Sequence, residues 1–287
     1  MARKQRIAVC ALNIVIHDEN KRDYSKLLKH CSDKHDVVQF NKTHAACLIG
    51  VKESFTPYGT YLFGTVFKFV NIRPPYFDIN KLSLILDEDG NPKNIIDPQI
   101  RSNTLDVNFC LFEDSHRIFV DVRNITPKMA KDFFERIFKL EEIVAEFGEV
   151  DVSLHSTKEY IEEILRIPSL RSLEIFVHRP NPISMNRFDF DVEESLREQN
   201  AESLQHRLAT RSDNITPNEL TKNFMNAARN NGRVIGRGRD EDGKTVEFDT
   251  DNSPLVDSIF TEKNEPYLFA LARAAQKVWE KITTQDG

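Results

Sequence analysis

The sequence is short of cysteine, glycine and proline. Its 287 residues include four cysteines, ten glycines and twelve prolines. So few cysteines, widely spaced, argue against a disulfide framework or a four-cysteine zinc site. So little glycine and proline argues against a collagen-like or largely disordered chain. The longest apolar run, residues 7–16, is interrupted by Asn13 and is too short to cross a bilayer.

An excess of positive charge is also missing. The chain carries 39 lysines and arginines against 45 aspartates and glutamates, a net charge of −6. This balance argues against a protein that coats nucleic acid over its whole surface, but it permits a local basic face. His17 and Asp18, instead of small residues, follow the apolar run. We therefore expect no signal peptide, no direct membrane insertion and a cytoplasmic location.

Catalytic signatures are absent as well. The sequence has no GxxxxGK[ST] phosphate loop, no GxGxxG after a strand, no GxSxG and no HExxH. The eight histidines never pair at the spacing that metal ligands require. We therefore expect no metal and no cofactor, and we favour a binding protein over an enzyme.

What the sequence does contain is a series of strand and helix patterns. Residues 7–16 are apolar at both parities, which predicts a strand buried on both faces. Alternation over 105–111 and 118–122 predicts a hairpin, and Thr126 followed by Pro127 predicts a helix start. A strand, a helix and another strand are expected next, at 150–154, 159–166 and 173–177.

The pattern changes after Pro180. A charged helix is expected over 191–209, and a second hairpin is expected over 233–249, where Gly243 supplies the positive φ of its turn. The fold class we predict is α+β, with a mixed β-sheet covered by helices followed by a smaller helix–hairpin–helix region. The expected divisions are a sheet domain, a linker and a C-terminal region, at 1–180, 181–190 and 191–287.

Residues 229–239 contain four arginines and no acidic residue. If this segment is a strand, three of the arginines have the same parity, so their side chains project from one face of a two-stranded ribbon. There the guanidinium groups could contact successive phosphates of a nucleic-acid backbone. The glycines between them would let a polyanion approach the main chain; they are Gly232, Gly236 and Gly238. Together with two lysines of a basic N-terminal zone, the candidates for binding nucleic acid are Arg229, Arg233, Arg237, Arg239, Lys244, Lys26 and Lys29.

Internal ion pairing is the competing interpretation of these arginines. With a three-residue loop, Arg237 stands opposite Glu247 and Arg233 lies near Asp251, so cross-strand pairs would explain both without any ligand. Residues 211–250 hold seven basic and seven acidic side chains. Both interpretations stay open from the sequence.

Three acidic residues suggest a different function. Asp106, Glu113 and Asp121 lie on or near the first hairpin, where a two-metal nuclease would hold its ions. Against this, acids on a half-buried sheet usually face solvent, and Arg123 replaces the expected catalytic lysine. A metal-dependent nuclease is therefore an alternative. A protein-interaction adaptor that docks its partner on the charged helix 191–209 is another.

The last helix carries an apolar stripe. Its spacing of three and four residues favours packing on its own domain or the seam of a homodimer. The candidate dimer residues are Leu268, Leu271, Ala275, Val278 and Ile282.

The order of elements resembles a known family. The matching segments are RSLEIFVHRP (171–180) and RDEDGKTVEF (239–248), followed by the step Ser253–Pro254 and a terminal amphipathic helix. This layout is similar to that of the RexA-type phage-exclusion proteins and their bacterial relatives. The resemblance implies a homodimeric, non-enzymatic protein of antiviral defence. Such a protein binds duplex DNA with little sequence preference and works with a separate membrane effector. It transfers no individual site residue.

Overall fold

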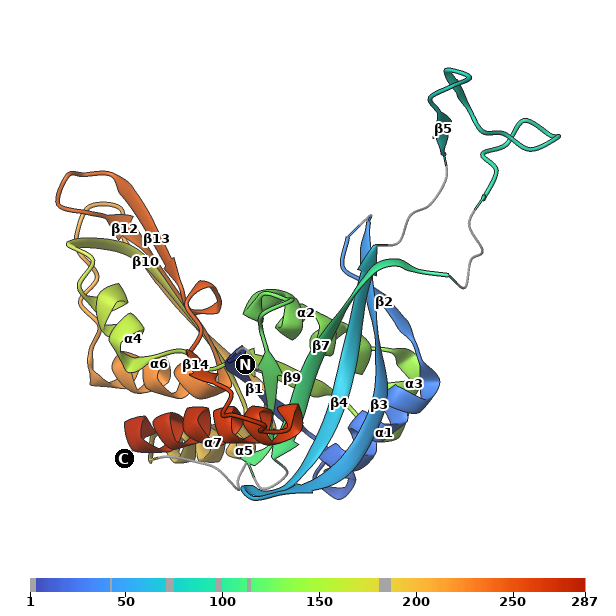
Figure 1. Cartoon of the computed structure of the whole chain (residues 1–287). Coiled ribbons are helices and arrows are strands. Elements are labelled where there is room, and N and C mark those ends of the chain that lie inside the picture. The colour runs from blue at the N-terminus through green and yellow to red at the C-terminus, as the bar shows by residue number, and fades with distance from the viewer. Residues whose placement is uncertain are drawn as a thin grey trace.

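The computed structural model describes residues 4–41, 43–70, 75–95, 100–112, 115–180 and 187–286. Two β-sheets organise these residues, and every pairing between their strands is antiparallel (Figure 1). The α+β class is therefore confirmed, but the expected mixed sheet is wrong. All four cysteines are free thiols, as their spacing predicted.

The first sheet has the strand order β14-β1-β8-β7-β4-β3-β2, and β9 pairs with β1 beside β14. β1 is central and buried along almost its whole length, as the apolar run predicted. The strands are β1 (Arg6–Ile16), β2 (Val37–Gln39), β3 (His44–Thr56), β4 (Gly59–Val70), β7 (Ser102–Phe112), β8 (Arg117–Asp121), β9 (Val150–Leu154) and β14 (Val256–Phe260).

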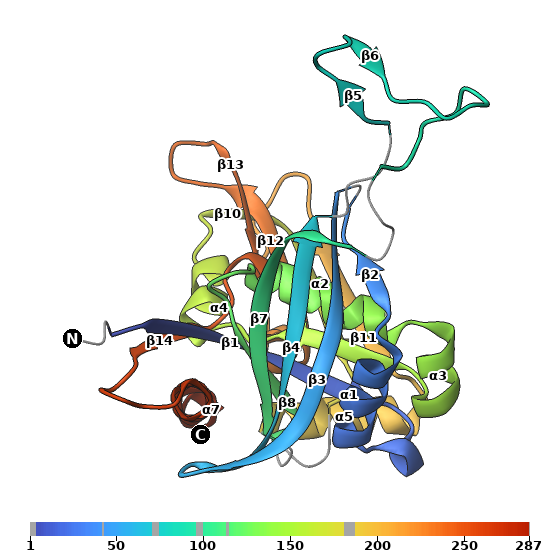
Figure 2. The ribbon, with the colours of Figure 1, turned by 45° about the vertical axis from the view of Figure 1, so that its right-hand side comes forward.

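Helices cover both faces of the first sheet, which explains why β1 has no solvent-facing side (Figure 2). On one face lie α1 (Tyr24–Lys34), α2 (Pro127–Phe138) and α3 (Glu141–Phe147). The hydroxyl of Thr126 accepts a hydrogen bond from the backbone N–H of Met129, so the predicted cap of α2 is confirmed. On the opposite face lies α7 (Tyr267–Asp286).

The stripe of α7 packs against the first sheet of its own chain. Leu271, Ala275, Val278 and Ile282 are buried in the same cluster as β1, and Leu268 packs partly buried against it. The predicted dimer seam is therefore wrong at these residues, because their apolar surface is already covered within one molecule.

The second sheet has four strands in the order β11-β10-β12-β13, with helices α4, α5 and α6 packed on one face. The hairpin β12–β13 has the register expected from a three-residue loop, with Arg237 opposite Glu247. The elements are α4 (Lys158–Leu165), β10 (Ser169–His178), α5 (Arg187–Glu198), β11 (Ser203–Ala209), α6 (Glu219–Asn231), β12 (Gly232–Arg239) and β13 (Thr245–Asp249).

The charged helix predicted over 191–209 is only half right. α5 ends at Glu198, and the following segment is strand β11, which pairs with β10. Leu204 and Leu208 misled the prediction because residues four apart lie on one face of a helix and also on one face of a strand.

The two sheets do not divide the chain at 181–190. β10 precedes that segment and belongs to the second sheet, whereas β14 and α7 follow it and belong to the first. Residues 181–186 of the expected linker lie outside the described residues, and residues 187–190 begin α5. The hairpin expected in a separate helix–hairpin–helix region is one edge of the four-stranded sheet.

An arm projects from the first sheet between β4 and β7 (Figures 1 and 2). Its residues 75–95 contain a two-stranded ribbon of β5 (Phe77–Asp78) and β6 (Ser83–Leu84). Among the described helices, none is both long and apolar enough to cross a bilayer.

Candidate nucleic-acid interface

The face of the second sheet opposite α4, α5 and α6 carries the predicted arginines, and we refer to it as the open face. Strand alternation points Arg233, Arg237 and Arg239 to this side, as their shared parity predicted, and β11 adds Arg207. The arginines come from strands β11 and β12, with β10 between them.

A ladder of ion pairs crosses all four strands of the open face. Arg237 donates from Nε to Oε2 of Glu247 over 2.6 Å and from Nη1 to Oε1 of Glu174 over 3.0 Å. The same Oε1 of Glu174 lies 3.5 Å from Nε of Arg207. The internal pairing that competed with nucleic-acid binding is therefore confirmed for Arg237.

Arg233 is engaged more deeply. Its Nε donates to Oδ1 of Asp249 over 2.8 Å and lies 3.5 Å from Oδ2 of Asp251, while Lys131 of α2 reaches Asp251 over 2.7 Å. Burial would raise the pKa of Asp249, but the hydrogen bond from Arg233 holds that pKa below its usual range. Arg233 on β12, Asp251 and Lys131 on α2 thus form a chain of ion pairs that links the second sheet to α2.

The remaining candidates differ in their access to solvent. Arg239 is exposed, and no carboxylate among the described residues pairs with it. Lys244 is exposed, with Nζ 3.4 Å from Asp242. Arg229 is only 4% exposed on the inner side of α6, so its assignment to a surface contact is wrong.

The glycines of β12 serve packing within the protein. A Cβ at Gly236 would lie 2.6 Å from Cγ2 of Ile164, and one at Gly238 would lie 2.2 Å from the carbonyl oxygen of Ser169. Because these glycines have no side chain, α4 and β10 can pack close to β12. Our interpretation that they admit a polyanion is wrong, because they face the covered side of the sheet.

The two lysine candidates of α1 lie on a different part of the molecule. Lys26 Nζ is 2.7 Å from Oε1 of Glu146, and the hydrogen bond between them raises the pKa of Lys26. Lys29 is exposed one helical turn further along α1. These lysines and the open face belong to separate elements, α1 and the second sheet.

The acidic candidates are not assembled into a metal site. Asp121 is buried and accepts hydrogen bonds from Nη2 of Arg123 and from the hydroxyl of Tyr267, both over 2.6 Å. Asp106 is exposed on β7, and Glu113 lies outside the described residues. Over the part of the chain that the structure describes, no three His, Cys, Asp or Glu side chains are placed to hold a metal ion.

A buried polar cluster escaped the sequence analysis. Arg117 donates from Nε to Nε2 of His155 over 2.7 Å, and Asn13 donates to the side chain of Asn231 over 2.8 Å. Burial first, then the charge of Arg117, hold the pKa of His155 well below its usual value. The signal available was Asn13, a polar residue within the apolar run 7–16, because a buried amide needs a partner.

The fold defines an α+β protein built on two antiparallel sheets, each covered by helices of its own. Residues 5–276 match the family model described as a domain of unknown function (DUF4747), and the chain belongs to that family. No curated protein matches the chain.

Proposed function

We propose that this chain is a cytoplasmic, non-enzymatic protein that binds duplex DNA with little sequence preference through the open face. The observation that carries the proposal is a set of four guanidinium groups on that face that the nearby carboxylates do not all engage. Glu174, Glu247, Asp249 and Asp251 pair with Arg233 and Arg237, whereas Arg207 only approaches Glu174 at 3.5 Å and Arg239 meets no carboxylate among the described residues. The guanidinium groups are those of Arg207, Arg233, Arg237 and Arg239.

Ion pairing leaves donors on these arginines. A guanidinium group has five N–H bonds, and Arg237 directs Nε and Nη1 to carboxylates, so the N–H groups of Nη2 remain for a phosphate. Arg207 has a side chain that is 65% exposed and only a long 3.5 Å approach to Glu174. The carboxylates hold the arginines extended, which reduces the entropy lost when a phosphate binds.

A charge-reversal experiment tests this proposal. The variant with Arg207→Glu and Arg239→Glu should bind a labelled duplex at least about tenfold more weakly, and its salt dependence should fall by about two units of slope. Arg166→Glu is the matched control, because Arg166 lies at the end of α4 on the helix side of the sheet with a side chain 74% exposed. Equal affinity of wild type and double variant, or equal loss in the control, would overturn the proposal.

The setting in antiviral defence is part of the same proposal. What supports it is the resemblance of segments 171–180 and 239–248 to RexA-type proteins, together with an open face suited to sequence-independent contact. A separate effector would then convert DNA binding into a response.

A second candidate function, protein interaction, is favoured by the arm. Large apolar side chains lie exposed there: Phe77 is 58%, Ile79 77% and Leu82 75% accessible. A lone two-stranded ribbon is marginally stable in water, and exposed apolar patches usually mark an interface. We propose that a second copy of the chain covers this surface, so that the expected homodimer would form through the arm and not through α7.

The mass of the assembly in solution tests that assignment. Light scattering should give a dimer for the wild type and a monomer for Ile79→Asp with Leu82→Asp. The control Val256→Asp changes an exposed apolar residue of β14, outside the arm, and should leave the dimer intact. A monomeric wild type, or a dimer that survives the arm substitutions, would contradict it.

A further inference from the structure

A cavity of about 240 Å³ lies between α7 and the face of the first sheet that α7 covers, and we refer to it as the aromatic cavity. Five aromatic rings line it, those of Tyr58, Tyr61, Phe112, Phe119 and Trp279. They come from the turn before β4 and from β4, β7, β8 and α7. Tyr61 and Phe119 are buried, whereas Tyr58 and Trp279 are partly exposed and form the rim.

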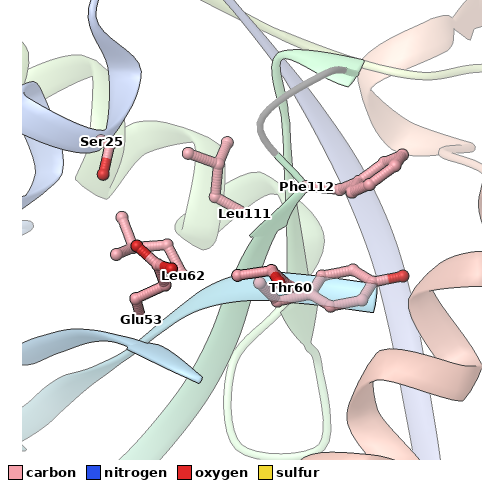
Figure 3. Close-up of a pocket in the computed structure, with 7 residues that line it drawn as sticks. Ser25, Glu53, Thr60, Leu62, Leu111 and Phe112 are labelled. Carbon is pink, nitrogen blue, oxygen red and sulfur yellow. The ribbon is translucent and has the colours of Figure 1, made fainter. Parts of the chain in front are cut away.

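The first sheet separates the aromatic cavity from α1. Tyr61 and Phe112 pack on the α7 side of their strands, whereas the neighbouring Leu62 and Leu111 pack on the α1 side. Figure 3 shows this alternation on β7, where Leu111 lies toward Ser25 of α1 and Phe112 lies on the other side of the strand. The rings of Tyr61 and Phe112 pack with centroids 5.4 Å apart and close this wall. A ligand must therefore fit within the aromatic cavity alone.

The size and lining of the cavity suit two fused aromatic rings. An apolar cavity of about 150 Å³ holds one benzene molecule. At about 240 Å³, the aromatic cavity has room for a second fused ring but not for a third. Of the described residues that line it, none is charged, so a charged ligand would be buried without a counter-ion. The ligand should therefore be a flat, neutral bicycle, because aromatic walls accept such rings stacked or edge to face.

One buried polar group gives the cavity a preference within that class. Tyr61 is only 3% exposed, and its hydroxyl has no hydrogen-bond partner among the described residues. Burial raises the pKa of Tyr61, so the hydroxyl keeps its proton at neutral pH and can donate it. A buried hydroxyl without a partner costs free energy, and a ligand that brings an acceptor recovers that cost.

The wall formed by Trp279 is held in place by Arg117. The guanidinium group lies 4.6 Å from the centroid of the indole. Arg117 is itself buried, and it donates to Nε2 of His155 over 2.7 Å and to the carbonyl oxygen of Ser115 over 2.6 Å. These contacts fix the indole before a ligand arrives, which lowers the entropy lost on binding.

We propose that the aromatic cavity binds a neutral bicyclic aromatic heterocycle, which accepts a hydrogen bond from the hydroxyl of Tyr61. The ring system lies between the rings of the sheet and Trp279, and Gln276 lines the same cavity with a second polar side chain. This site uses none of the arginines of the open face, so it goes beyond the proposed binding of DNA.

The experiment uses probes that differ in one property each. Quinoline has two fused rings and one ring nitrogen as acceptor, naphthalene has the same shape without the acceptor, and acridine has the acceptor and a third ring. Calorimetric titration of the full chain in mildly alkaline buffer, where all three are neutral, should show binding of quinoline and of naphthalene. Acridine should bind at least about tenfold more weakly than quinoline, because its third ring exceeds the cavity.

Tyr61→Phe removes the hydroxyl and keeps the ring. It should weaken quinoline about threefold to tenfold, the contribution of one hydrogen bond, and leave naphthalene unchanged. Tyr76→Phe makes the same change in the arm, outside the cavity, and should alter neither affinity. Ala275→Leu places extra volume in the cavity and should weaken both probes more than about tenfold. If that variant does not fold, the comparison of Tyr61→Phe with Tyr76→Phe decides alone.

Trp279 places the ligand in the cavity. It is the only tryptophan of the chain, so intrinsic tryptophan emission reports this wall alone. Quinoline should change the emission of the protein beyond its effect on free N-acetyltryptophanamide, which corrects for light absorbed by the probe. The Arg207→Glu, Arg239→Glu variant should bind quinoline like the wild type, so loss of DNA binding and loss of this site are distinguishable.

Three results would overturn the inference. The first is quinoline that gives neither heat of binding nor thermal stabilisation, since a ligand of the folded state must raise its stability. The second is a Tyr61→Phe variant that weakens both probes equally or neither of them. The third is toluene, which mimics a phenylalanine side chain, binding more tightly than quinoline. The cavity would then receive a side chain of a partner protein instead of a free heterocycle.

Discussion

Arg237 and Glu247 stand directly opposite each other on β12 and β13, and Nε of the arginine donates to Oε2 of the glutamate over 2.6 Å. The same guanidinium group also meets Glu174 on β10. Each carboxylate therefore orients the arginine and competes with a phosphate for its N–H groups. The effect of a substitution on DNA affinity should therefore depend on whether it changes the arginine or one of its carboxylate partners.

Neutralising Glu247 should strengthen DNA binding. Glu247→Gln keeps a hydrogen-bond acceptor beside Arg237 but removes the competing charge, so duplex affinity should rise about threefold to tenfold at low salt. Fluorescence anisotropy measures it. Glu219→Gln is the matched control, since Glu219 is an exposed acid on α6 with a side chain 85% accessible. An equal rise in the control would show a general charge effect and contradict the role of the open face.

Removing Arg233 should destabilise the protein far more than removing Arg237. Arg233→Met leaves the buried carboxylate of Asp249 without its bidentate partner, so the free energy of unfolding should fall by about 3 kcal/mol. Arg237→Met removes a half-exposed pair and should cost less than about 1 kcal/mol. Urea unfolding of both variants gives the comparison. Similar losses would contradict the distinction between an anchoring and an exposed arginine.

The stability of the protein should fall as the medium is acidified, partly because of His155. In the folded state the pKa of His155 is held well below its ordinary value. Below about pH 6.5 the unfolded chain therefore binds a proton at His155 that the folded chain does not bind. The stability present above about pH 6.5 is therefore lost as pH falls, by about 1 kcal/mol between about pH 6.5 and 5.5. In His155→Gln this loss of stability between about pH 6.5 and 5.5 should vanish. The control His35→Asn, which changes an exposed histidine, should still show it. An unchanged pH dependence in His155→Gln would contradict the assignment.

Methyl groups added to the glycines of β12 should have graded effects. In Gly238→Ala the new Cβ meets the backbone oxygen of Ser169, which cannot move without breaking the sheet, so a loss of about 3 kcal/mol is expected. In Gly236→Ala it meets the Cγ2 methyl of buried Ile164, a side chain that can shift slightly where a sheet backbone cannot, and the loss should be smaller, about 2 kcal/mol. Thermal unfolding ranks the two variants. The reverse ranking would mean that these glycines do not face the covered side.

Features set by local pattern were predictable from the sequence. Alternation identified the hairpin of β7 and β8, a capping threonine identified the start of α2, and the short loop at Gly243 gave the register of β12 with β13. Pairing partners distant in the chain were not predictable in this way. Nothing local to residues 256–260 indicates that β14 lies beside β1, the strand against which the stripe of α7 is buried.

The candidate site was predictable in part for the same reason. Shared parity placed the arginines of β12 on one face. The glycines have the opposite parity, so alternation directs them to the other face, which the helices cover, and our interpretation of polyanion access did not take this into account. Glu174 and Arg207 were missed as members of the ladder because they come from β10 and β11, and β11 was expected to be helical.

The salt dependence of duplex binding tests the central claim most directly. If guanidinium groups of the open face neutralise phosphates, the logarithm of the association constant should fall linearly with the logarithm of salt concentration, with a slope of about −3. The slope should move toward about −1 in the Arg207→Glu, Arg239→Glu variant. No binding at about 50 mM salt, or binding that salt does not weaken, would contradict the account.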